Sequence, residues 1–453
     1  MNKIVLVYPS FSDSEDKREK TLYIDIPLSV AALASQLHGK YEVEIVDERL
    51  DKYSDDEITL KLKNVFMVGI SAITSYQIVN GLKFAQKVRK YSKEIKIIWG
   101  GWHASLMPQE TIKHSLVDIV VIGQGEYIIS KIADCLKSKD NLSLIPNIIY
   151  KSENGSIIKT QQVVFNNLQM TNNVINGYQY LKIDRYIHEG WGNRRVLGYE
   201  SSRGCPFSCK FCSIGAIFKR KWYGLHAENV YNDIEWLKKN YQIDAVHFFD
   251  NNFFVSKKRA LSIAEEFEKN KIGIKWDGTV VIHQFLNFSQ KEIESFKRSG
   301  FYRIIVGVES GDEEVLAKIS KKHTNVQVLE LVKRCKENGL LPSLSFMAGF
   351  PWNPEEDTEN TIKLIEKVKN IYNKTEILLF IFSPYLGTPL YKIARYYGIK
   401  STNSLEEWAD FTYDKANTPW VSDKLKRKID RYLSFFGTKE MTSDEQKFYQ
   451  GFH

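Results

Sequence analysis

The sequence predicts an α/β protein with a doubly wound (Rossmann-like) parallel-sheet domain, then a partial (β/α)6 TIM-like barrel and a small C-terminal segment. Short apolar runs alternate with stretches of helical periodicity along most of the chain. This alternation is typical of strand–helix units in parallel sheets. With 453 residues, the chain is also too long for one ordinary core.

The first third of the chain supplies the doubly wound domain, which we place at residues 1–140. Its apolar runs predict strands at 4–8, 43–46, 67–71, 95–99 and 119–122. Amphipathic stretches predict helices at 28–37, 55–62, 78–91, 107–114 and 126–136. Periodicity then weakens over 141–194, where Asn, Gln and Gly accumulate, so we expect a linker carrying a hairpin.

A second alternating series predicts the barrel, which we place at residues 195–397. Its strands are expected at 196–201, 246–250, 274–280, 303–308, 341–347 and 377–382. Its helices are expected at 229–241, 257–270, 290–299, 326–338 and 354–371. Because right-handed crossovers bring every loop that follows a strand to one rim, the chemistry should lie on those loops. Residues 398–453 are expected to cap the barrel mouth.

Composition narrows the class of protein. A hydrophobic content of 43% with 26% charged residues suits a folded chain, and no apolar run is long enough to span a membrane. The net charge of +8 comes from dispersed residues, so nucleic-acid binding is not expected. Three of the five cysteines fall within eight positions, which suits metal binding in a reducing compartment and predicts a cytoplasmic protein.

The motif Cys205-Pro-Phe-Ser-Cys209-Lys-Phe-Cys212 directly follows the first barrel strand. Three thiolates on one short loop can bind three irons of a cubane cluster and leave the fourth iron open. The alternative is structural zinc, but that site needs four ligands, and the nearest spare one downstream is His226. Cys135 and Cys335 stand alone in helical patterns and are expected to be buried apolar residues.

This loop resembles the radical SAM signature, three cysteines spaced three and then two residues apart with an aromatic residue, here Phe211, before the last. The resemblance implies that Cys205, Cys209 and Cys212 hold a [4Fe-4S] cluster whose open iron chelates S-adenosylmethionine. An electron from the cluster would then cleave this molecule to a 5′-deoxyadenosyl radical.

Later strand ends also resemble that family. The resemblance implies that Asp250, Asn251 and Asn252 accept the methionine amino group and that Glu309, followed by Ser310, binds the ribose hydroxyls. Phe350 of Gly349-Phe350-Pro351 and Tyr385 of Ser383-Pro384-Tyr385 would lie near the adenine and the barrel mouth. For Glu309 a salt bridge at the barrel rim remains an alternative.

Small residues and glycines follow the strands of the front domain, where an open parallel sheet forms its ligand crevice. With the larger residues that lie among them, the candidate cofactor residues are Ser71, Ala72, Ile73, Thr74, Tyr76, Gly100, Gly101, Trp102, His103, Gly123, Gly125 and Glu126. Alone they would fit a nucleotide or a flavin about as well. Placed before a radical SAM core, they resemble the cobalamin-binding domain of cobalamin-dependent radical SAM enzymes.

The sequence departs from one known cobalamin-binding pattern in the residues expected to bind cobalt. The Asp-x-His-x-x-Gly signature that supplies a histidine to cobalt in methionine synthases is absent. We therefore expect cobalt without histidine ligation, with His103 contacting the cofactor's edge or nucleotide tail. Tyr76 or another side chain of the loop after the third strand would lie under the lower face of the cofactor.

The resemblance implies a C-methyltransferase that uses methylcobalamin and the 5′-deoxyadenosyl radical on an unactivated carbon of a small molecule, for example an antibiotic-type substrate. An electron donor such as flavodoxin or ferredoxin would be its partner. Two alternatives stay open: a radical rearrangement, ring contraction or cyclisation without methyl transfer, and a non-catalytic cobalamin sensor.

Overall fold

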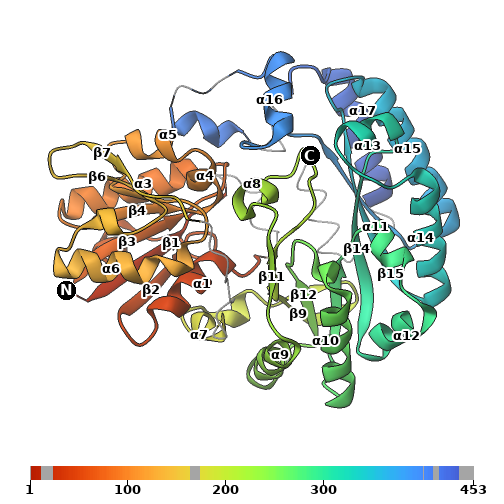
Figure 1. The fold of residues 1–453 in the computed structure, drawn as a ribbon, viewed down its shortest axis with the longest axis horizontal. Helices are drawn as coiled ribbons and strands as arrows, with labels where there is room; N and C mark the ends of the chain where they lie inside the picture. The colour runs from red at the N-terminus through yellow and green to blue at the C-terminus, as the bar shows by residue number, and fades with distance from the viewer. Residues whose placement is uncertain are drawn as a thin grey trace. The chain divides into compact units, whose positions relative to one another are not determined.

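The computed structural model describes residues 2–11, 24–163, 174–400, 402, 404–411 and 418–437 (Figure 1). These residues form two compact units. The first comprises 2–11, 26–163, 174–185, 402 and 404–411, and the second comprises 24–25, 186–400 and 418–437. No helix among the described residues is both long and apolar enough to cross a membrane.

The first unit contains a seven-stranded sheet in the order β2-β1-β3-β4-β5-β6-β7. Its strands are β1 Lys3–Tyr8, β2 Glu42–Asp47, β3 Val65–Ser71, β4 Lys96–Gly100, β5 Ile119–Val121, β6 Ile148–Lys151 and β7 Ile157–Lys159. The first five pair in parallel, which confirms the predicted doubly wound sheet. Strand order reverses at β1, and open sheets of this kind bind ligands at the carboxyl ends of the strands near that point.

The helices of this unit follow the expected series closely. They are α1 Leu28–Leu37, α2 Asp55–Lys61, α3 Gln77–Tyr91, α4 Gly101–Leu106, α5 Pro108–Lys113, η2 Gly125–Tyr127, α6 Ile129–Ser138, η3 Leu142–Leu144, α7 Val174–Tyr178 and η4 Ile183–Arg185. The short helix α4, which begins at Gly101 directly after β4, is an addition to the expected series. Trp102 and His103 therefore lie in the first turn of a helix.

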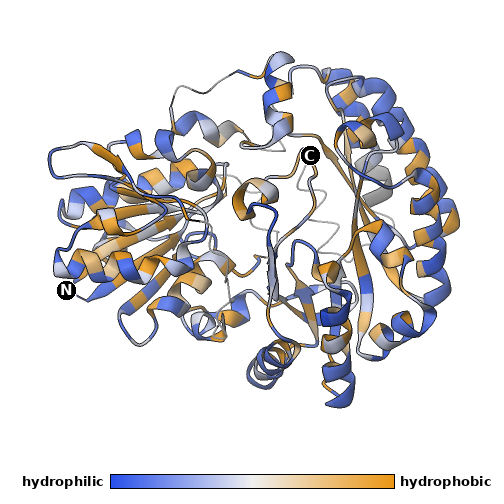
Figure 2. Ribbon diagram, in the orientation of Figure 1, coloured by the Kyte–Doolittle hydropathy of each residue, from blue (hydrophilic) through white to orange (hydrophobic). Residues whose placement is uncertain are grey.

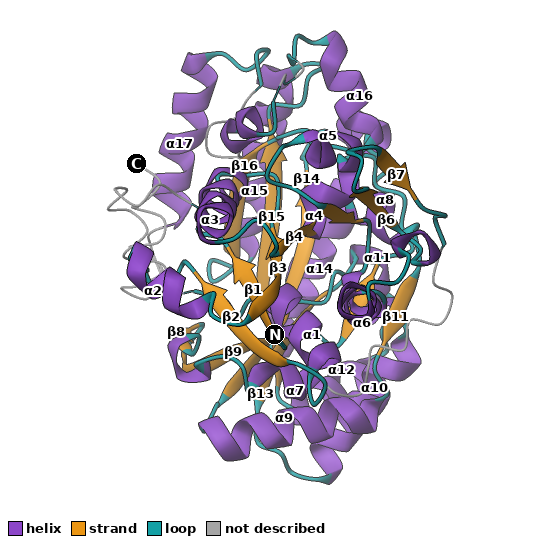
Figure 3. Ribbon diagram, turned by 90° about the vertical axis from the view of Figure 1, so that its left-hand side faces the viewer, coloured by secondary structure: helices purple, strands orange, loops and turns teal. Residues whose placement is uncertain are grey.

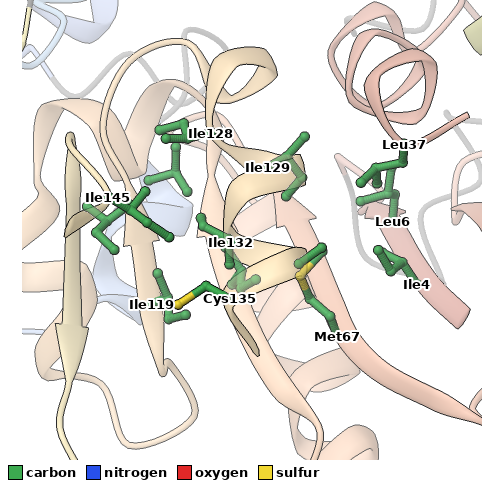
Figure 4. Close-up of a cluster of buried hydrophobic side chains, with 14 of the residues drawn as sticks. Ile4, Leu6, Leu37, Met67, Ile119, Ile128, Ile129, Ile132, Cys135 and Ile145 are labelled. Atoms are coloured by element: carbon green, nitrogen blue, oxygen red, sulfur yellow. The ribbon is translucent and has the colours of Figure 1, made fainter. Parts of the chain in front are cut away.

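Buried aliphatic side chains hold the helices against this sheet (Figure 4). Ile4 and Leu6 of β1, Met67 of β3 and Ile132 of α6 are almost fully buried in one cluster. Complete burial of such a side chain contributes roughly 1.5–3 kcal/mol. Cys135 of α6 belongs to the same cluster and makes no disulfide.

The described residues of 141–194 contain one hairpin and the start of a second. Strands β6 and β7 form one, which extends the first sheet by antiparallel pairing with β5. Strands β8 His188–Gly190 and β9 Asn193–Tyr199 form the other and begin the sheet of the second unit.

The second unit contains an open sheet in the order β16-β15-β14-β13-β12-β9-β8. The parallel strands are β9, β12 Ala245–Phe248, β13 Lys275–Thr279, β14 Phe301–Glu309, β15 Leu341–Ala348 and β16 Glu376–Ile381. These six strands confirm the predicted partial barrel (Figure 3). A ribbon of β10 Ser202–Gly204 and β11 Trp222–Gly224 flanks the cysteine loop.

Helices cover the outer face of this sheet, with hydrophilic residues turned outward and hydrophobic ones concentrated on the strands (Figure 2). The helices of the unit are α8 Ile214–Phe218, α9 Ala227–Tyr241, η5 Phe253–Val255, α10 Lys257–Lys269, α11 Ile282–Leu286, α12 Gln290–Arg298, α13 Glu313–Lys318, α14 Asn325–Asn338, α15 Pro354–Ile371 and α16 Pro389–Tyr396, of which α8 lies beside the β10–β11 ribbon and not on that outer face. Capping boxes fix several starts, as at Ser289 before α12 and Thr324 before α14.

The described parts of the C-terminal segment divide between the two units. In the first unit, Trp408 of η6 Glu406–Asp410 donates from Nε1 to Oε1 of Glu110 at 2.5 Å. In the second unit, α17 Asp423–Gly437 lies along β16, and Nε1 of Trp420 donates to the carbonyl of Gly349 at 2.9 Å. The expectation of one cap over residues 398–453 stays a prediction.

Candidate active site

The three cysteines lie on the loop between β10 and α8, at the carboxyl end of the barrel strands. All three thiols are partly buried and form no disulfide. Burial raises the pKa of each thiol, to about 11 for Cys212, and neighbouring thiols add to the rise at Cys205 and Cys212. The three sulfur atoms are therefore close enough to influence one another.

Three thiols on one short loop are the donor set of a cubane iron–sulfur cluster. Among the described residues, no three His, Cys, Asp or Glu side chains converge tightly enough to hold one metal ion. In a cubane each thiolate binds a different iron, so the cysteines of a cluster site stand farther apart than those around one zinc. Metal binding would displace the thiol protons.

Backbone bonds and an apolar contact fix the middle of the loop. The N–H of Lys210 donates to the carbonyl of Ile319 at 3.0 Å, and the carbonyl of Lys210 accepts from the N–H of Leu390 at 3.1 Å. Phe211 packs on a buried cluster that includes Phe350. The ring of Phe350 stacks on Phe382 with centroids 4.5 Å apart. The aromatic residue before the last cysteine thus anchors the loop to the core.

Glu309 lies at the end of β14 in an unusual conformation. Its φ of +75° falls in the left-handed region, directly after an irregularity in pairing with β15. Non-glycine residues held there are concentrated at functional sites. Its Oε1 pairs with Nζ of Lys321 at 2.9 Å, so the salt bridge that was the alternative interpretation of Glu309 is present. That pair leaves the role of Glu309 toward a ribose untested.

Lys321 and His323 are site residues that sequence reasoning missed. Nζ of Lys321 also donates to the carbonyl of Gly307 at 2.8 Å. Although burial opposes the charge, Glu309 and then Cys209 raise the pKa of Lys321. Nε2 of His323 lies 3.1 Å from the carbonyl of Val308, and burial followed by Lys321 lowers its pKa to about 4. The site therefore presents one ammonium beside the thiols and a neutral imidazole behind it.

The three polar residues after β12 face different partners. Asp250 is 2% exposed, and its carboxylate accepts hydrogen bonds from Ser201 and Ser202. Oδ1 of Asn251 accepts from the N–H of Gly204 at 2.9 Å. Oδ1 of Asn252 accepts from the N–H of Phe254 at 3.1 Å and so begins η5. The structure brings Asp250 and Asn251, but not Asn252, onto the segment that enters the cysteine loop.

A buried carboxylate ties the next two strand ends together. Oγ of Ser310 donates to Asp357 at 2.6 Å, and the N–H groups of Gly349 and Phe350 donate to the same carboxylate at 2.9 and 3.2 Å. Burial raises the pKa of Asp357 to about 6. Beyond β16, Tyr385 is 43% exposed, and desolvation followed by Cys212 raises the pKa of its hydroxyl.

In the first unit, the expected cofactor residues gather at the ends of β3, β4 and β5. Oγ of Ser71 lies 3.0 Å from Oγ of Ser29, and Oγ1 of Thr74 lies 3.0 Å from Nδ1 of His103. His103 is fully buried, its ring lies 5.7 Å from that of Trp408, and burial lowers its pKa to about 3. It is therefore a neutral imidazole in the core of this unit.

The remaining expected residues lie around this core. Ala72 is buried, whereas Ile73 is exposed. Tyr76 lies directly before α3, and Nζ of Lys83 is 5.6 Å from the centroid of its ring. Trp102 on α4 and Glu126 on η2 are both partly buried. Gly125 packs against Leu33. All of them border the carboxyl edge of the sheet.

Two observations fit a large ligand at this edge. A Cβ built on Gly100 or Gly123 would meet no atom within 4 Å, so backbone there faces open space. Nε2 of His103 and Oε1 of Gln124 are buried without a hydrogen-bond partner among the described residues. Buried polar atoms are rarely left unsatisfied, so these two are suited to bonding a cofactor. Gly101 has φ +87°, and a side chain there would strike the backbone of Ala72.

Taken together, a three-cysteine loop on a parallel half barrel, with an ion pair beside it, defines an iron–sulfur enzyme. Comparison with known proteins extends this assignment. A model of the radical SAM superfamily matches residues 199–365, and a B12 binding domain model matches residues 19–133. The chain therefore combines a radical SAM domain with a B12 binding domain, the domain pair of cobalamin-dependent radical SAM enzymes, whose cofactors are a [4Fe-4S] cluster, S-adenosylmethionine and cobalamin.

Similar proteins cover most of the chain. An uncharacterized methyltransferase of Pyrococcus horikoshii is 28% identical over 90% of this chain and 87% of its own length. An anaerobic magnesium-protoporphyrin IX monomethyl ester cyclase of Rubrivivax gelatinosus is 24% identical over 75% and 61%, respectively. The structure of the methyltransferase TsrM from Kitasatospora setae shares the fold, with 16% identity, a TM-score of 0.68, and coverage of 90% of this chain and 81% of TsrM.

Proposed function

We propose that this chain is a C-methyltransferase that places a methyl group on an unactivated carbon of a small molecule. The observation that carries the proposal is the presence in one chain of a three-cysteine loop and a cobalamin-binding sheet. The Pyrococcus relative, matched over most of both chains, is named a methyltransferase. When bound, the cluster and S-adenosylmethionine supply a radical that removes substrate hydrogen, and cobalamin supplies the methyl group.

The chain's own residues bind the cluster and orient S-adenosylmethionine. Cys205, Cys209 and Cys212 would each bind one iron. Glu309 accepts hydrogen bonds, and its carboxylate is already ordered by Lys321, so little ordering is left when ribose hydroxyls arrive. Ser310 would support Glu309 from its bond to Asp357.

Asn251, Asn252, Phe350 and Tyr385 are proposed to line the rest of this nucleoside site. In the first unit the open backbone at Gly100 and Gly123 would let the corrin approach closely. Nε2 of His103 would bond the cofactor's periphery, since cobalt ligation by histidine is not expected.

The substrate and the electron donor belong to the same proposal. A structure of TsrM, which shares the fold, holds tryptophan as substrate, and this supports a small-molecule substrate for the present chain. Residues 201–224 hold five basic and no acidic side chains, so an acidic donor such as flavodoxin or ferredoxin would be attracted to this stretch.

Anaerobic turnover tests the proposal. Reconstituted protein with a reductant and S-adenosylmethionine should form 5′-deoxyadenosine, and with substrate it should also form S-adenosylhomocysteine and a product heavier by one methylene group. Changing Cys205, Cys209 and Cys212 together to alanine should abolish iron binding and deoxyadenosine formation. Cys335→Ala is the matched control because Cys335 is buried in α14. Wild-type protein that binds iron but makes no deoxyadenosine would contradict the proposal.

The Rubrivivax cyclase favours a second candidate, radical cyclisation without methyl transfer. Deoxyadenosine without S-adenosylhomocysteine, and a product with no added methylene, would support it.

A further inference from the structure

The segment that leads into the cysteine loop is held by a buried charged residue on each side. Asp250, just after β12, and Arg259, in α10, both bond Ser201. Ser201 lies four residues before Cys205, and both Ser201 and Ser202 are completely buried. The backbone entering the cluster site is therefore held from outside the loop.

The carboxylate of Asp250 is already occupied by these partners. Its Oδ1 accepts from the N–H of Ser201 at 2.7 Å, and its Oδ2 accepts from Oγ of Ser201 at 2.7 Å and from Oγ of Ser202. A carboxylate offers about four acceptor positions, so three are taken. Because Asp250 is also 2% exposed, a methionine ammonium has little access to it.

Arg259 of α10 also holds Ser201. Its Nη2 donates to both O and Oγ of Ser201 at 2.8 Å, and its Nε donates to the carbonyl of Leu225 at 2.7 Å. The N–H of Leu225 returns a bond to the carbonyl of Ser201 at 2.9 Å. Charge-assisted bonds of this kind are short and strong. Ser201 is thus held by its N–H, its carbonyl and its hydroxyl.

The last residue before Cys205 is held as well. The N–H of Gly204 donates to Asn251, the neighbour of Asp250. Gly204 has φ +81°, and a Cβ there would lie 2.1 Å from the carbonyl of Lys221. The path of the chain into the first cysteine is therefore fixed residue by residue.

We propose that Asp250 is a positioning residue for the iron–sulfur cluster, acting through Ser201 and Ser202 to place Cys205, and that it does not bind S-adenosylmethionine. This assigns Asp250 a different task from the one its sequence position implies. The inference rests on the proposed cluster site, because it requires that Cys205 bind iron.

The test compares variants before and after S-adenosylmethionine is added. Asp250→Ala and Ser202→Ala proteins would be reconstituted anaerobically, and iron, sulfide and the EPR spectrum of the reduced cluster measured without S-adenosylmethionine. Asp250→Ala should lose iron and change the EPR spectrum, and Ser202→Ala should shift the spectrum in the same direction. Asp250→Asn, which keeps the shape and one acceptor oxygen, should be closer to wild type.

Asp233→Asn is the matched control. Asp233 is a partly buried carboxylate of α9 that accepts a hydrogen bond from the hydroxyl of Tyr199 at 2.5 Å, two residues before Ser201. This variant should keep the wild-type iron content and spectrum.

The inference is overturned if Asp250→Ala keeps the wild-type cluster but loses affinity for S-adenosylmethionine, since Asp250 would then be a ligand of that molecule. If Asp250→Ala does not fold, the Ser202→Ala variant provides the test. An EPR spectrum of Ser202→Ala that is identical to the wild-type spectrum would then overturn the inference. A wild-type protein that holds no cluster would instead remove the proposed function itself.

Discussion

Nζ of Lys321 lies 2.9 Å from Oε1 of Glu309, and the side chains are 12% and 10% exposed. Both belong to the rim of the barrel at the cysteine loop, where Lys321 also acts electrostatically on Cys209 and Cys212. One ammonium is thus shared between a carboxylate and the thiols that would hold iron. The first two predictions follow from this pair.

Lys321→Met should weaken binding of S-adenosylmethionine and lower the reduction potential of the cluster. The variant leaves Glu309 buried without its cation, which costs about 1.5–3 kcal/mol for a charged hydrogen bond. Removing a positive charge beside the cluster disfavours the added electron, by roughly 40 mV for each kcal/mol of lost attraction. EPR-monitored potentiometry measures the second effect. Lys322→Met, at the exposed neighbour, should change neither quantity, and equal effects at both lysines would contradict the prediction.

Gly307→Ala should displace the carboxylate of Glu309 without unfolding the barrel. A Cβ at Gly307 would lie 2.3 Å from Oε1 of Glu309, the far end of a side chain that can move. We expect a clear loss of affinity for S-adenosylmethionine but a change of only about 1 kcal/mol in the free energy of unfolding. Calorimetry would measure the affinity for S-adenosylmethionine, and urea unfolding would measure the free energy of unfolding. Ser345→Ala, at the position on β15 paired with Gly307, should leave affinity unchanged.

Asp357→Asn should alter how stability depends on pH. Burial raises the pKa of Asp357 to about 6, so this group stabilises the fold below its ordinary pKa of about 3.9 and loses that contribution as pH rises through 6. The difference amounts to about 3 kcal/mol. The asparagine side chain can still accept hydrogen bonds from the N–H groups of Gly349 and Phe350, but it does not titrate. The free energy of unfolding of the variant, relative to that of wild type, should therefore be higher at pH 7 than at pH 4. An equal difference at both pH values in urea titrations would refute this.

His103→Phe should weaken cobalamin binding without changing the cobalt ligands. Phenylalanine keeps a ring against Trp408 but removes Nε2, the buried nitrogen without a partner. Loss of one hydrogen bond, about 0.5–1.5 kcal/mol, predicts a rise in the dissociation constant of roughly 2- to 12-fold. EPR of Co(II) cobalamin should show no imidazole nitrogen in wild type or variant. His38→Phe, at an exposed position of the same unit, is the control, and imidazole splitting lost only in His103→Phe would show that His103 binds cobalt.

The alternation of strands and helices was sufficient to predict both sheets, because period-two and period-3.6 apolar patterns persist wherever an element packs on a core. The ends of strands were less predictable. The first barrel strand was expected to reach 201, but β9 ends at Tyr199 because Ser201 and Ser202 are turned toward Asp250. Such a turn depends on tertiary hydrogen bonds rather than on apolar periodicity.

The cysteine loop and Glu309 were found from sequence because they form compact motifs at strand ends. Lys321 was not found, since it lies twelve residues beyond Glu309 and returns to the site only because the short helix α13 reverses the chain. The direction of Asp250 could not be predicted either, because the conformation of the loop after β12 decides whether its carboxylate faces a ligand or Ser201.

Cys135 and Cys335 are buried, whereas Cys205, Cys209 and Cys212 are partly exposed, so a reagent in solution can reach only the thiols of the loop. An alkylating reagent added to folded, metal-free protein should therefore modify three sulfurs and no more. Protein with a full cluster should resist the reagent. The mass of each labelled molecule would then report how many copies of the enzyme carry a complete cluster, a count that loosely bound iron cannot distort.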